Sequence, residues 1–424
     1  MTGQSERGEF SFILSEKLCL QSLCKILPLS PPCFHIFIVT LWGKLKTKLN
    51  MKFVVSSALL SQRLQTIGRV IVPKSTLAVL ENILFKVAGN ELTLVAADGE
   101  ITLTSTLELV DSEGEVTFMI NAKTIQEAIR EIPEQPVDIY VNEENYAVTV
   151  EYQNGKFNFV AQAADEYPVP PAMTEERVTF SMDSQLLYNG VNRSLFAASN
   201  DALRPQIGGL YFDVKENETA IVATDAQKMA CTQYPAIGAG QVGSFILPKK
   251  PANMLKGFLV KDEGQTQVEF SMRNAVFTTE NYTMNCRLVE GRYPNYAAVI
   301  PTANDIIVTV NRVAFISALR RVLLFSNVAS GCVKLKLENN NMQISSHELD
   351  FSKSADEALL CDYNQMPMSI GFRGSFLLEI LNNIEAEEIM LKLAGPSRAG
   401  LILPVEQKET ETVLMMIMPM MIND

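Results

Sequence analysis

Hydrophobic and polar positions follow two periods along this chain, and the two periods recur in a fixed order. From Met51 onward, a short alternating stretch predicts a strand, and apolar residues three to four positions apart then predict an amphipathic helix. The same order returns twice more at a spacing of roughly 125 residues. The apolar stripes of the three first helices are Leu60, Leu64 and Ile67; Leu187, Val191 and Leu195; and Phe315, Leu319 and Val322. The pattern therefore predicts three domains built on one α+β plan.

The rest of each unit repeats as well. Alternating strands are predicted at 84–87, 210–214 and 333–337, strands that end in polar turns at 95–99, 222–226 and 344–348, and strand-to-helix junctions at 117–123, 244–250 and 368–374. Closing hairpins follow at 148–150 with 157–159, and at 268–270 with 275–277. Proline-rich text after Pro168 and Pro294 marks linkers, so we predict domains at 51–172, 173–300 and 301–424.

Residues 1–50 differ from the repeats. They hold three of the seven cysteines and the only tryptophan, and their longest apolar stretch, 34–42, is too short to span a bilayer. Met51 is followed at once by a strand and a helix start. We interpret 1–50 as an extension upstream of the functional start, with a targeting segment as the alternative.

Composition excludes several classes of function. The 424 residues carry a net charge of −12, which argues against a wholly basic nucleic-acid coat but leaves room for a local basic stripe. Two histidines and no CxxC spacing argue against a metal centre, and the scattered cysteines are typical of reduced thiols in a cytosolic protein. Phosphate-binding and nucleophile motifs are missing, so we expect no cofactor, no metal and no catalytic site. Asp98 and Asp225 occupy equivalent repeat positions, which we interpret as turn-forming aspartates at strand ends.

Basic residues recur in or beside the two helices of every repeat. They are Arg63, Arg69, Lys123, Arg130, Arg193, Lys249, Lys250, Lys256, Arg320 and Arg321. If the helices share one side of the molecule, an acidic protein gains a basic lining that binds phosphates without reading bases. For any one of these residues, a solvated helix face remains the alternative.

Short motifs in this order carry a resemblance to a known family. Residues 51–53, 223–225, 291–296 and 418–420 are similar to those of the bacterial DNA polymerase III beta subunit, the sliding clamp, over the whole length from Met51. The resemblance implies a head-to-tail homodimeric ring of six domains, with helices lining the hole. It also implies a non-catalytic cytoplasmic protein that encircles double-stranded DNA without sequence preference, confers processivity and has no membrane contact. The implied partners are the clamp loader, the alpha subunit of the replicative polymerase and other proteins with clamp-binding motifs.

The resemblance also implies site residues. A groove for partner peptides would comprise Thr224, Ala226, Gln227, Lys228, Met229, Ile207, Pro294, Val299, Ile417, Met418, Pro419 and Met420. DNA contacts would include Lys74 and Arg204, and the dimer interface Phe157, Phe159, Leu324 and Phe325. The family's usual Gly-His-Arg-Leu is replaced here by residues 226–229, and Ala298 stands where an arginine is common, so peptide preference is expected to differ.

Two other hypotheses stay open on the sequence. A three-repeat scaffold could bind peptides without encircling DNA, and it would be a monomer. An enzyme could hold a site between repeats, for which Asp225 is the best candidate.

Overall fold

The three repeats form three units of like construction. The computed structural model describes residues 50–75, 77–168, 176–327, 329–348 and 353–422. Of the predicted extension 1–50, only Asn50 lies in this part, as the first residue of β1, and the predicted boundary at 172/173 lies outside it. The boundary at 300/301 stays a prediction.

The elements of each unit keep the predicted order. The first unit has β1 (Asn50–Ser56), α3 (Ser57–Ile67), β2 (Asn82–Ala88), β3 (Glu91–Ala97), β4 (Ile101–Glu108), β5 (Asp111–Glu113), β6 (Val116–Asn121), α4 (Ala122–Arg130), β7 (Pro136–Asn142), β8 (Ala147–Tyr152), β9 (Gly155–Val160) and β10 (Gln162–Ala163). The second has β11 (Val178–Asp183), α5 (Ser184–Leu195), the short 3₁₀ helix η4 (Pro205–Ile207), β12 (Gly209–Val214), β13 (Glu218–Thr224), β14 (Lys228–Pro235), β15 (Gly243–Pro248), α6 (Lys249–Leu259), β16 (Gln265–Phe270), β17 (Asn274–Thr278) and β18 (Tyr282–Arg287). The third has β19 (Ile306–Asn311), α7 (Arg312–Leu323), β20 (Cys332–Glu338), β21 (Asn341–Glu348), β22 (Lys353–Leu360), β23 (Met368–Arg373), α8 (Gly374–Asn382), β24 (Glu388–Leu393), β25 (Gly400–Pro404) and β26 (Thr412–Ile417).

Strands pass directly into helices because capping side chains stand at the junctions. The side chains of Ser56, Asn121, Asp183 and Asn311 each accept a hydrogen bond from a backbone N–H in the first turn of the following helix. Such a cap satisfies a donor that the helix itself cannot, and it stabilises the helix by about 1 kcal/mol. The predicted helix positions in all three units are confirmed to this extent.

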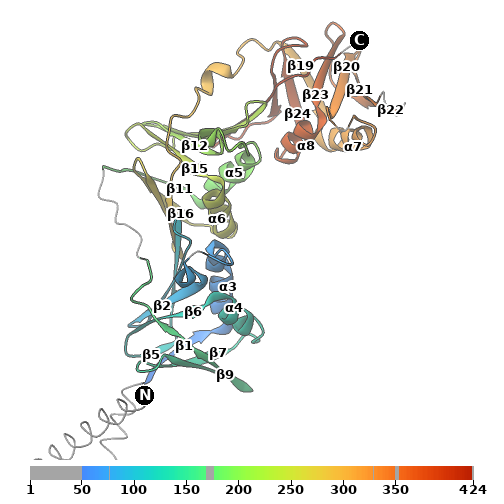
Figure 1. Cartoon of the computed structure of the whole chain (residues 1–424). Helices are drawn as coiled ribbons and strands as arrows, with labels where there is room; N and C mark the ends of the chain where they lie inside the picture. The colour runs from blue at the N-terminus through green and yellow to red at the C-terminus, as the bar shows by residue number, and fades with distance from the viewer. Residues whose placement is uncertain (1–49, 76, 169–175, 328, 349–352, 423–424) are drawn as a thin grey trace, which may run out of the picture.

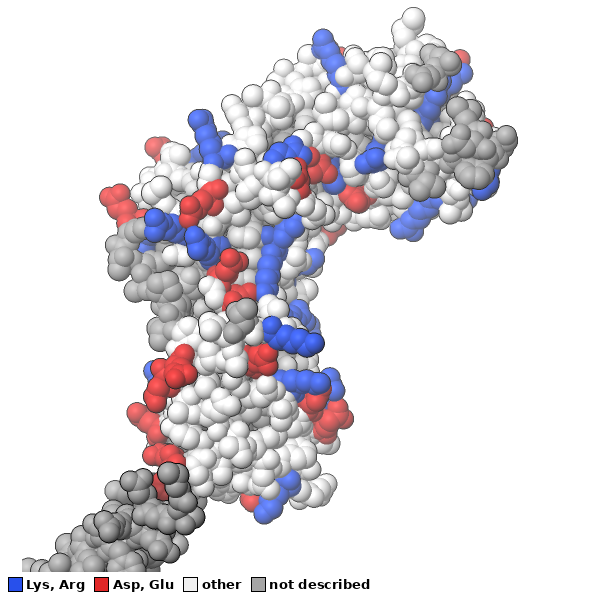
Figure 2. All heavy atoms as spheres, viewed as in Figure 1, with Lys and Arg blue, Asp and Glu red and all other residues white. Residues whose placement is uncertain are grey.

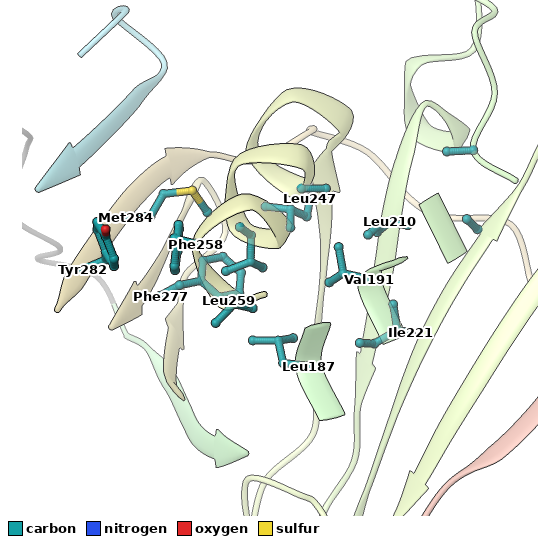
Figure 3. Close-up of a cluster of buried hydrophobic side chains, with 14 of the residues drawn as sticks. Leu187, Val191, Leu210, Ile221, Leu247, Phe258, Leu259, Phe277, Tyr282 and Met284 are labelled. Carbon is teal, nitrogen blue, oxygen red and sulfur yellow. The ribbon is translucent and has the colours of Figure 1, made fainter. Parts of the chain in front are cut away.

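The apolar stripes predicted for the helices form the core of each unit. Leu60, Leu64, Leu187, Phe315 and Leu319 are fully buried. In the second unit, Leu187 and Val191 of α5 meet Leu210, Ile221 and Leu247 of the sheet, and Phe258 and Leu259 of α6 meet Phe277, Tyr282 and Met284 (Figure 3). The helices therefore cover one face of the strands.

Sheets continue from one unit into the next. A nine-stranded sheet joins the first two units through antiparallel pairing of β4 with β18, and an eight-stranded sheet joins the last two through β14 and β26. A five-stranded sheet at one end of the chain finishes at β9, and a four-stranded sheet at the other end finishes at β22. Among the described residues, no strand pairs with the outer side of either edge strand.

The units follow one another along an arc. The helices α3, α4, α5, α6, α7 and α8 lie along its concave side, and the strands lie outside them (Figure 1). The helices therefore share one side of the molecule, which is the arrangement that a basic lining requires.

The turns after the third strand of each unit differ. Asp98 Oδ1 accepts the backbone N–H groups of Glu100 and Ile101, and Asp225 Oδ1 accepts those of Gln227 and Lys228, at 2.7–2.9 Å. This confirms the structural interpretation of both aspartates as turn formers. In the third unit the predicted turn at 344–348 is wrong, because β21 continues through Glu348 and pairs with β22 to that residue.

Candidate functional site

Cations gather along the concave edge of the arc, as Figure 2 shows. In the first unit Arg69, Lys123 and Arg130 are exposed and surround an open depression of about 330 Å³ between α3 and α4. Arg130 also contacts Glu131, with its Nε 3.3 Å from a carboxylate oxygen, but both side chains remain largely exposed. This cluster keeps three positive groups available to a phosphate backbone.

The predicted cations at the start of α6 are partly engaged. Lys249 donates to Asn200 Oδ1 at 2.5 Å, and burial, followed by the nearby Lys228, lowers the pKa of its ammonium group. Lys250 forms an ion pair with Asp98 of the first unit and also reaches the carbonyl of Val70. Lys250 therefore connects the second unit to the first.

Two of the predicted DNA contacts are buried in joints between units. Arg63 is only 9% exposed, donates to Asn281 Oδ1 at 2.6 Å and lies over the ring of Tyr282. Position 63 is three residues after Leu60 and four before Ile67, so Arg63 lies on the buried stripe of α3 itself and the expected DNA contact is wrong. We therefore leave Arg63 out of the DNA-facing set.

Arg193 is the second of these buried cations. It is 4% exposed, and its guanidinium group lies 2.7 Å from Glu411 and 3.1 Å from Glu385, both in the third unit. Burial disfavours its charge, but the two carboxylates outweigh this and raise the pKa of Arg193. Arg193 thus holds the second and third units together, and it too leaves the DNA-facing set.

The remaining predicted DNA contacts lie on the surface. Arg320 and Arg321 are exposed at the end of α7, where Arg321 pairs with Glu357 of β22 and so lowers the pKa of that carboxyl group. Lys74 is exposed in a loop and has a positive φ of 61°. Arg204 is exposed beside η4, 2.8 Å from Asp201.

Most of the predicted peptide-binding residues meet where β14 pairs with β26. Ile207 and Met229 are nearly fully buried in one apolar cluster on the sheet face opposite the helices. Pro294, Val299 and Met418 are exposed beside it, Val299 at 57% and Met418 at 44%. An apolar floor with exposed apolar rims can take Leu or Phe anchors of an extended peptide, and flexible methionines can adapt to them.

The strand β26 shows one error and one omission of the sequence prediction. Ile417 lies in the helix-side core, so it does not line this cleft. Met416, its neighbour, lies in the cleft-side cluster and was missed. Successive strand residues face opposite sides, so the choice of Met418 for the cleft could have indicated Met416.

Backbone contacts hold the rest of the predicted cleft residues. The Thr224 hydroxyl donates to the carbonyl of Lys228, and the exposed Ala226 has a positive φ of 75°. The N–H of Met418 donates to the carbonyl of Gln227, and that of Met420 to the carbonyl of Gly371 in β23, both at 2.8 Å. Residues 418–420, including Pro419, are thereby held against the second and the third unit.

Lys228 is the one buried charge of the predicted cleft. Its ammonium group lies 2.6 Å from Asp225 and 3.2 Å from Glu379 of α8, and 4.0 Å from the ring centre of Phe376. Glu379 and Phe376 carried no sequence signal, because only the pairing of units brings α8 to this turn. The ion pairs tie the cleft to the third unit.

The predicted dimer residues lie at the two ends of the arc. Phe157 and Phe159 are half-buried on the edge strand β9, with ring centres 6.4 Å apart. Leu324 is 78% exposed and Phe325 41% exposed at the end of α7. Phe157 and Phe159 pack partly against the core of the first unit, while Leu324 and Phe325 are apolar side chains exposed on the surface.

The described residues contain neither a cluster of metal-ligating side chains nor a membrane-spanning helix. No group of three or more His, Cys, Asp or Glu side chains in them could hold a metal ion. None of their helices is both long enough and apolar enough to cross a membrane.

Comparisons with known proteins agree with the repeat. Family models of the DNA polymerase III beta subunit match in succession: the N-terminal domain at residues 51–171, the central domain at 181–295 and the C-terminal domain at 297–421. The chain is 26% identical over 372 residues to the "Beta sliding clamp" of Pseudomonas putida, covering 86% of this chain and 99% of that protein. It is 26% identical over 365 residues to that of Haemophilus influenzae, with the same coverage.

Solved structures show the same likeness. A sliding clamp (DNA polymerase III subunit beta) from Pseudomonas aeruginosa bound to griselimycin superposes with a TM-score of 0.82 at 25% identity, covering 88% of this chain and 100% of that one. The DNA polymerase III beta subunit of Thermotoga maritima gives 0.79 at 24% identity with the same coverage.

Proposed function

The chain belongs to the DNA polymerase III beta subunit family, and from that premise we propose that it is a DNA sliding clamp. Two chains join head to tail into a closed ring. The ring encircles duplex DNA and tethers the replicative polymerase to it, which makes synthesis processive.

The pairing of strands between units is the main observation that supports a closed ring. The strand series β11-β16-β17-β18 and β19-β24-β25-β26 each pair through their last strand with the preceding unit, at β4 and β14. The corresponding last strand of the first unit is β9, and the strand of the third unit that corresponds to β4 and β14 is β22. Of the strands at these equivalent positions, only β9 and β22 lack a partner strand from a neighbouring unit in the described chain, and they lie at opposite ends of the arc. A second copy completes both joints in the same antiparallel manner and removes both open edges.

The mechanism needs no chemistry from this chain. A closed ring stays on DNA by topology, so contacts to phosphates can be weak and the ring can slide. Arg69 after α3 and the exposed cations of α4 and α7, together with the half-buried lysines of α6, would hold the duplex near the centre without reading bases. We place the protein in the cytoplasm with the DNA, as a non-catalytic subunit that a clamp loader opens and closes.

The cleft between the second and third units supplies the tether. The polymerase alpha subunit, the clamp loader and repair proteins would each insert a short peptide with apolar anchors there. Competition for one cleft would let partners exchange on a ring that stays in place.

A topological experiment tests the ring. Protein placed on nicked circular DNA with its clamp loader should stay bound after salt is raised, and it should leave when a single cut makes the DNA linear. Phe159→Asp should dissociate the dimer and abolish retention on circles, because it puts a charge into the joint. Val110→Asp, which puts the same charge at an exposed apolar position (71%) outside β9, is the control. Equal retention on circular and linear DNA would contradict encirclement.

The cation cluster of the first unit gives a second prediction. Replacing Arg69, Lys123 and Arg130 together with glutamine should reduce the slope of log K against log salt for duplex binding by up to about 3, since each lost phosphate contact removes about 0.9. The measurement is a salt titration of binding to a short duplex. Arg398→Gln, an exposed arginine in the β24–β25 turn, should leave the slope unchanged. An unchanged slope in the triple variant would remove this cluster from the DNA-facing set.

A further inference from the structure

A second groove lies beside the predicted cleft. It encloses about 900 Å³ on the face of the second unit that carries the apolar cluster, above β12 and β15 and beneath residues 288–297. The predicted cleft lies above β14 and β26 of the same sheet, with β13 between the two. Pro294 lines this groove and also belongs to the predicted cleft, so the two sites would adjoin at the segment that links the units.

The floor of this groove is aromatic. The rings of Tyr211 and Tyr293 stack with centres 4.5 Å apart, and Tyr296 meets Tyr211 edge-on at 6.0 Å. Met272 stands on the rim and is 88% exposed. Tyr293 and Tyr296 are largely buried, so the half-buried ring of Tyr211 and the flexible thioether of Met272 are the parts that can contact an apolar or aromatic side chain.

Some charged residues of the groove have hydrogen-bond or ion-pair partners, and others have no ion pair. Asp213 accepts a hydrogen bond from the Tyr296 hydroxyl at 2.7 Å, Lys215 pairs with Glu218, and Glu290 pairs with Arg287. Two further arginines of the lining, Arg273 and Arg292, are exposed and form no ion pair with any described residue. In a protein with a net charge of −12, two free guanidinium groups over an aromatic floor are a local positive site.

We propose that this groove is a second docking site, which takes an acidic peptide segment with an apolar or aromatic anchor. Guanidinium groups bind carboxylates with paired hydrogen bonds, so Arg273 and Arg292 would hold the acidic residues while the ring of Tyr211 takes the anchor. The occupant is a segment of a protein whose other segment occupies the predicted cleft, and in this respect the proposal rests on the proposed function.

Continuity of the two sites explains why each can be weak. A partner held in the cleft presents its neighbouring segment to the groove at a high effective concentration, so two modest contacts combine into firm attachment. Partners with an acidic flank would therefore outcompete those without one.

The test uses the full-length dimer and two fluorescent peptides in binding titrations. The first peptide, Asp-Asp-Glu-Phe-Asp-Glu-Asp, probes the groove, and its version with Asn and Gln in place of the acids is the control peptide. The second peptide, with Leu and Phe anchors and no charge, probes the cleft. The variants are R273E/R292E, the milder R273Q/R292Q, the control R398E, and a deletion of residues 418–424.

The acidic peptide should bind the unaltered protein saturably and more tightly than its neutral version. R273E/R292E should weaken it at least tenfold, with R273Q/R292Q between, while R398E and the deletion leave it unchanged. The cleft peptide should respond in the opposite way and lose affinity only in the deletion variant. If the deletion leaves its affinity unchanged while the acidic peptide behaves as expected, the proposed cleft is wrong and the proposed groove is still supported.

Other outcomes overturn the groove. They are no saturable binding of the acidic peptide, equal binding of its neutral version, or loss of its binding on deletion of 418–424. An oligothymidine of equal charge that binds more tightly and depends on the same two arginines would show a nucleic-acid site in place of a peptide site.

Discussion

Deletion of residues 418–424 is expected to weaken the binding of a Leu- and Phe-anchored peptide at least 100-fold, about 2.7 kcal/mol, and to leave the dimer intact. Met418 is exposed at a rim of the proposed cleft, and its backbone N–H donates to the carbonyl of Gln227 in the neighbouring turn. The deletion therefore removes a wall and releases the turn that faces it. Fluorescence anisotropy of the labelled peptide gives the affinity, and sedimentation gives the oligomeric state.

The dimer should survive because the terminal residues lie far from the predicted joint. Met420 is bridged to Gly371 of β23, and β23 is at the opposite edge of its sheet from β22. The point variant Met418→Glu should reproduce most of the loss without shortening the chain. Met421→Glu, at a residue 86% exposed, is its matched control. Peptide affinity that persists in the deletion would disprove the cleft assignment, whereas loss of the dimer would show that β23 matters to the joint.

The element order and the core could be predicted because local patterns fix them. Apolar residues such as Leu60 and Leu64 recur at helical spacing, and capping residues such as Asn121 stand before the helices, so both signals lie within a few residues of each other. Because the same order of elements occurs in three units, the assignment in each unit is supported by the other two. The same reasoning identified Asp98 as a turn residue.

The partners of the buried cations could not be predicted in the same way. The helical spacing indicates that Arg63 lies on the apolar stripe of α3, but its partner Asn281 and the Arg193 partner Glu411 each lie 218 residues further along the chain. Only the pairing of whole units brings them together. The same holds for Lys228, whose partner Glu379 belongs to another unit. Joints between repeats are thus where sequence periodicity carries least information.

Replacing Arg193 with alanine is expected to destabilise the joint between the second and third units by about 3 kcal/mol, because it leaves the carboxylate of Glu411 buried without its main partner. The Glu411 side chain is 3% exposed, and the arginine nitrogen is 2.7 Å from it. Lys408, 3.3 Å from Glu411, offsets part of the loss but is itself exposed. Urea denaturation monitored by fluorescence should show a lower midpoint concentration for the transition that includes this joint. Calorimetry should show a lower melting temperature for the same transition.

Two further variants decide whether the buried charge is the cause. The double variant Arg193→Leu with Glu411→Leu removes both charges and should recover much of the lost stability, since no carboxylate then remains buried alone. Arg398→Ala, at an exposed arginine outside the joints, should change the unfolding free energy by less than about 0.5 kcal/mol. If the single variant matched this control, the pair between α5 and the segment before β26 would hold nothing together. A double variant no more stable than the single one would instead assign the loss to packing, because in that case the uncompensated carboxylate contributes no cost of its own.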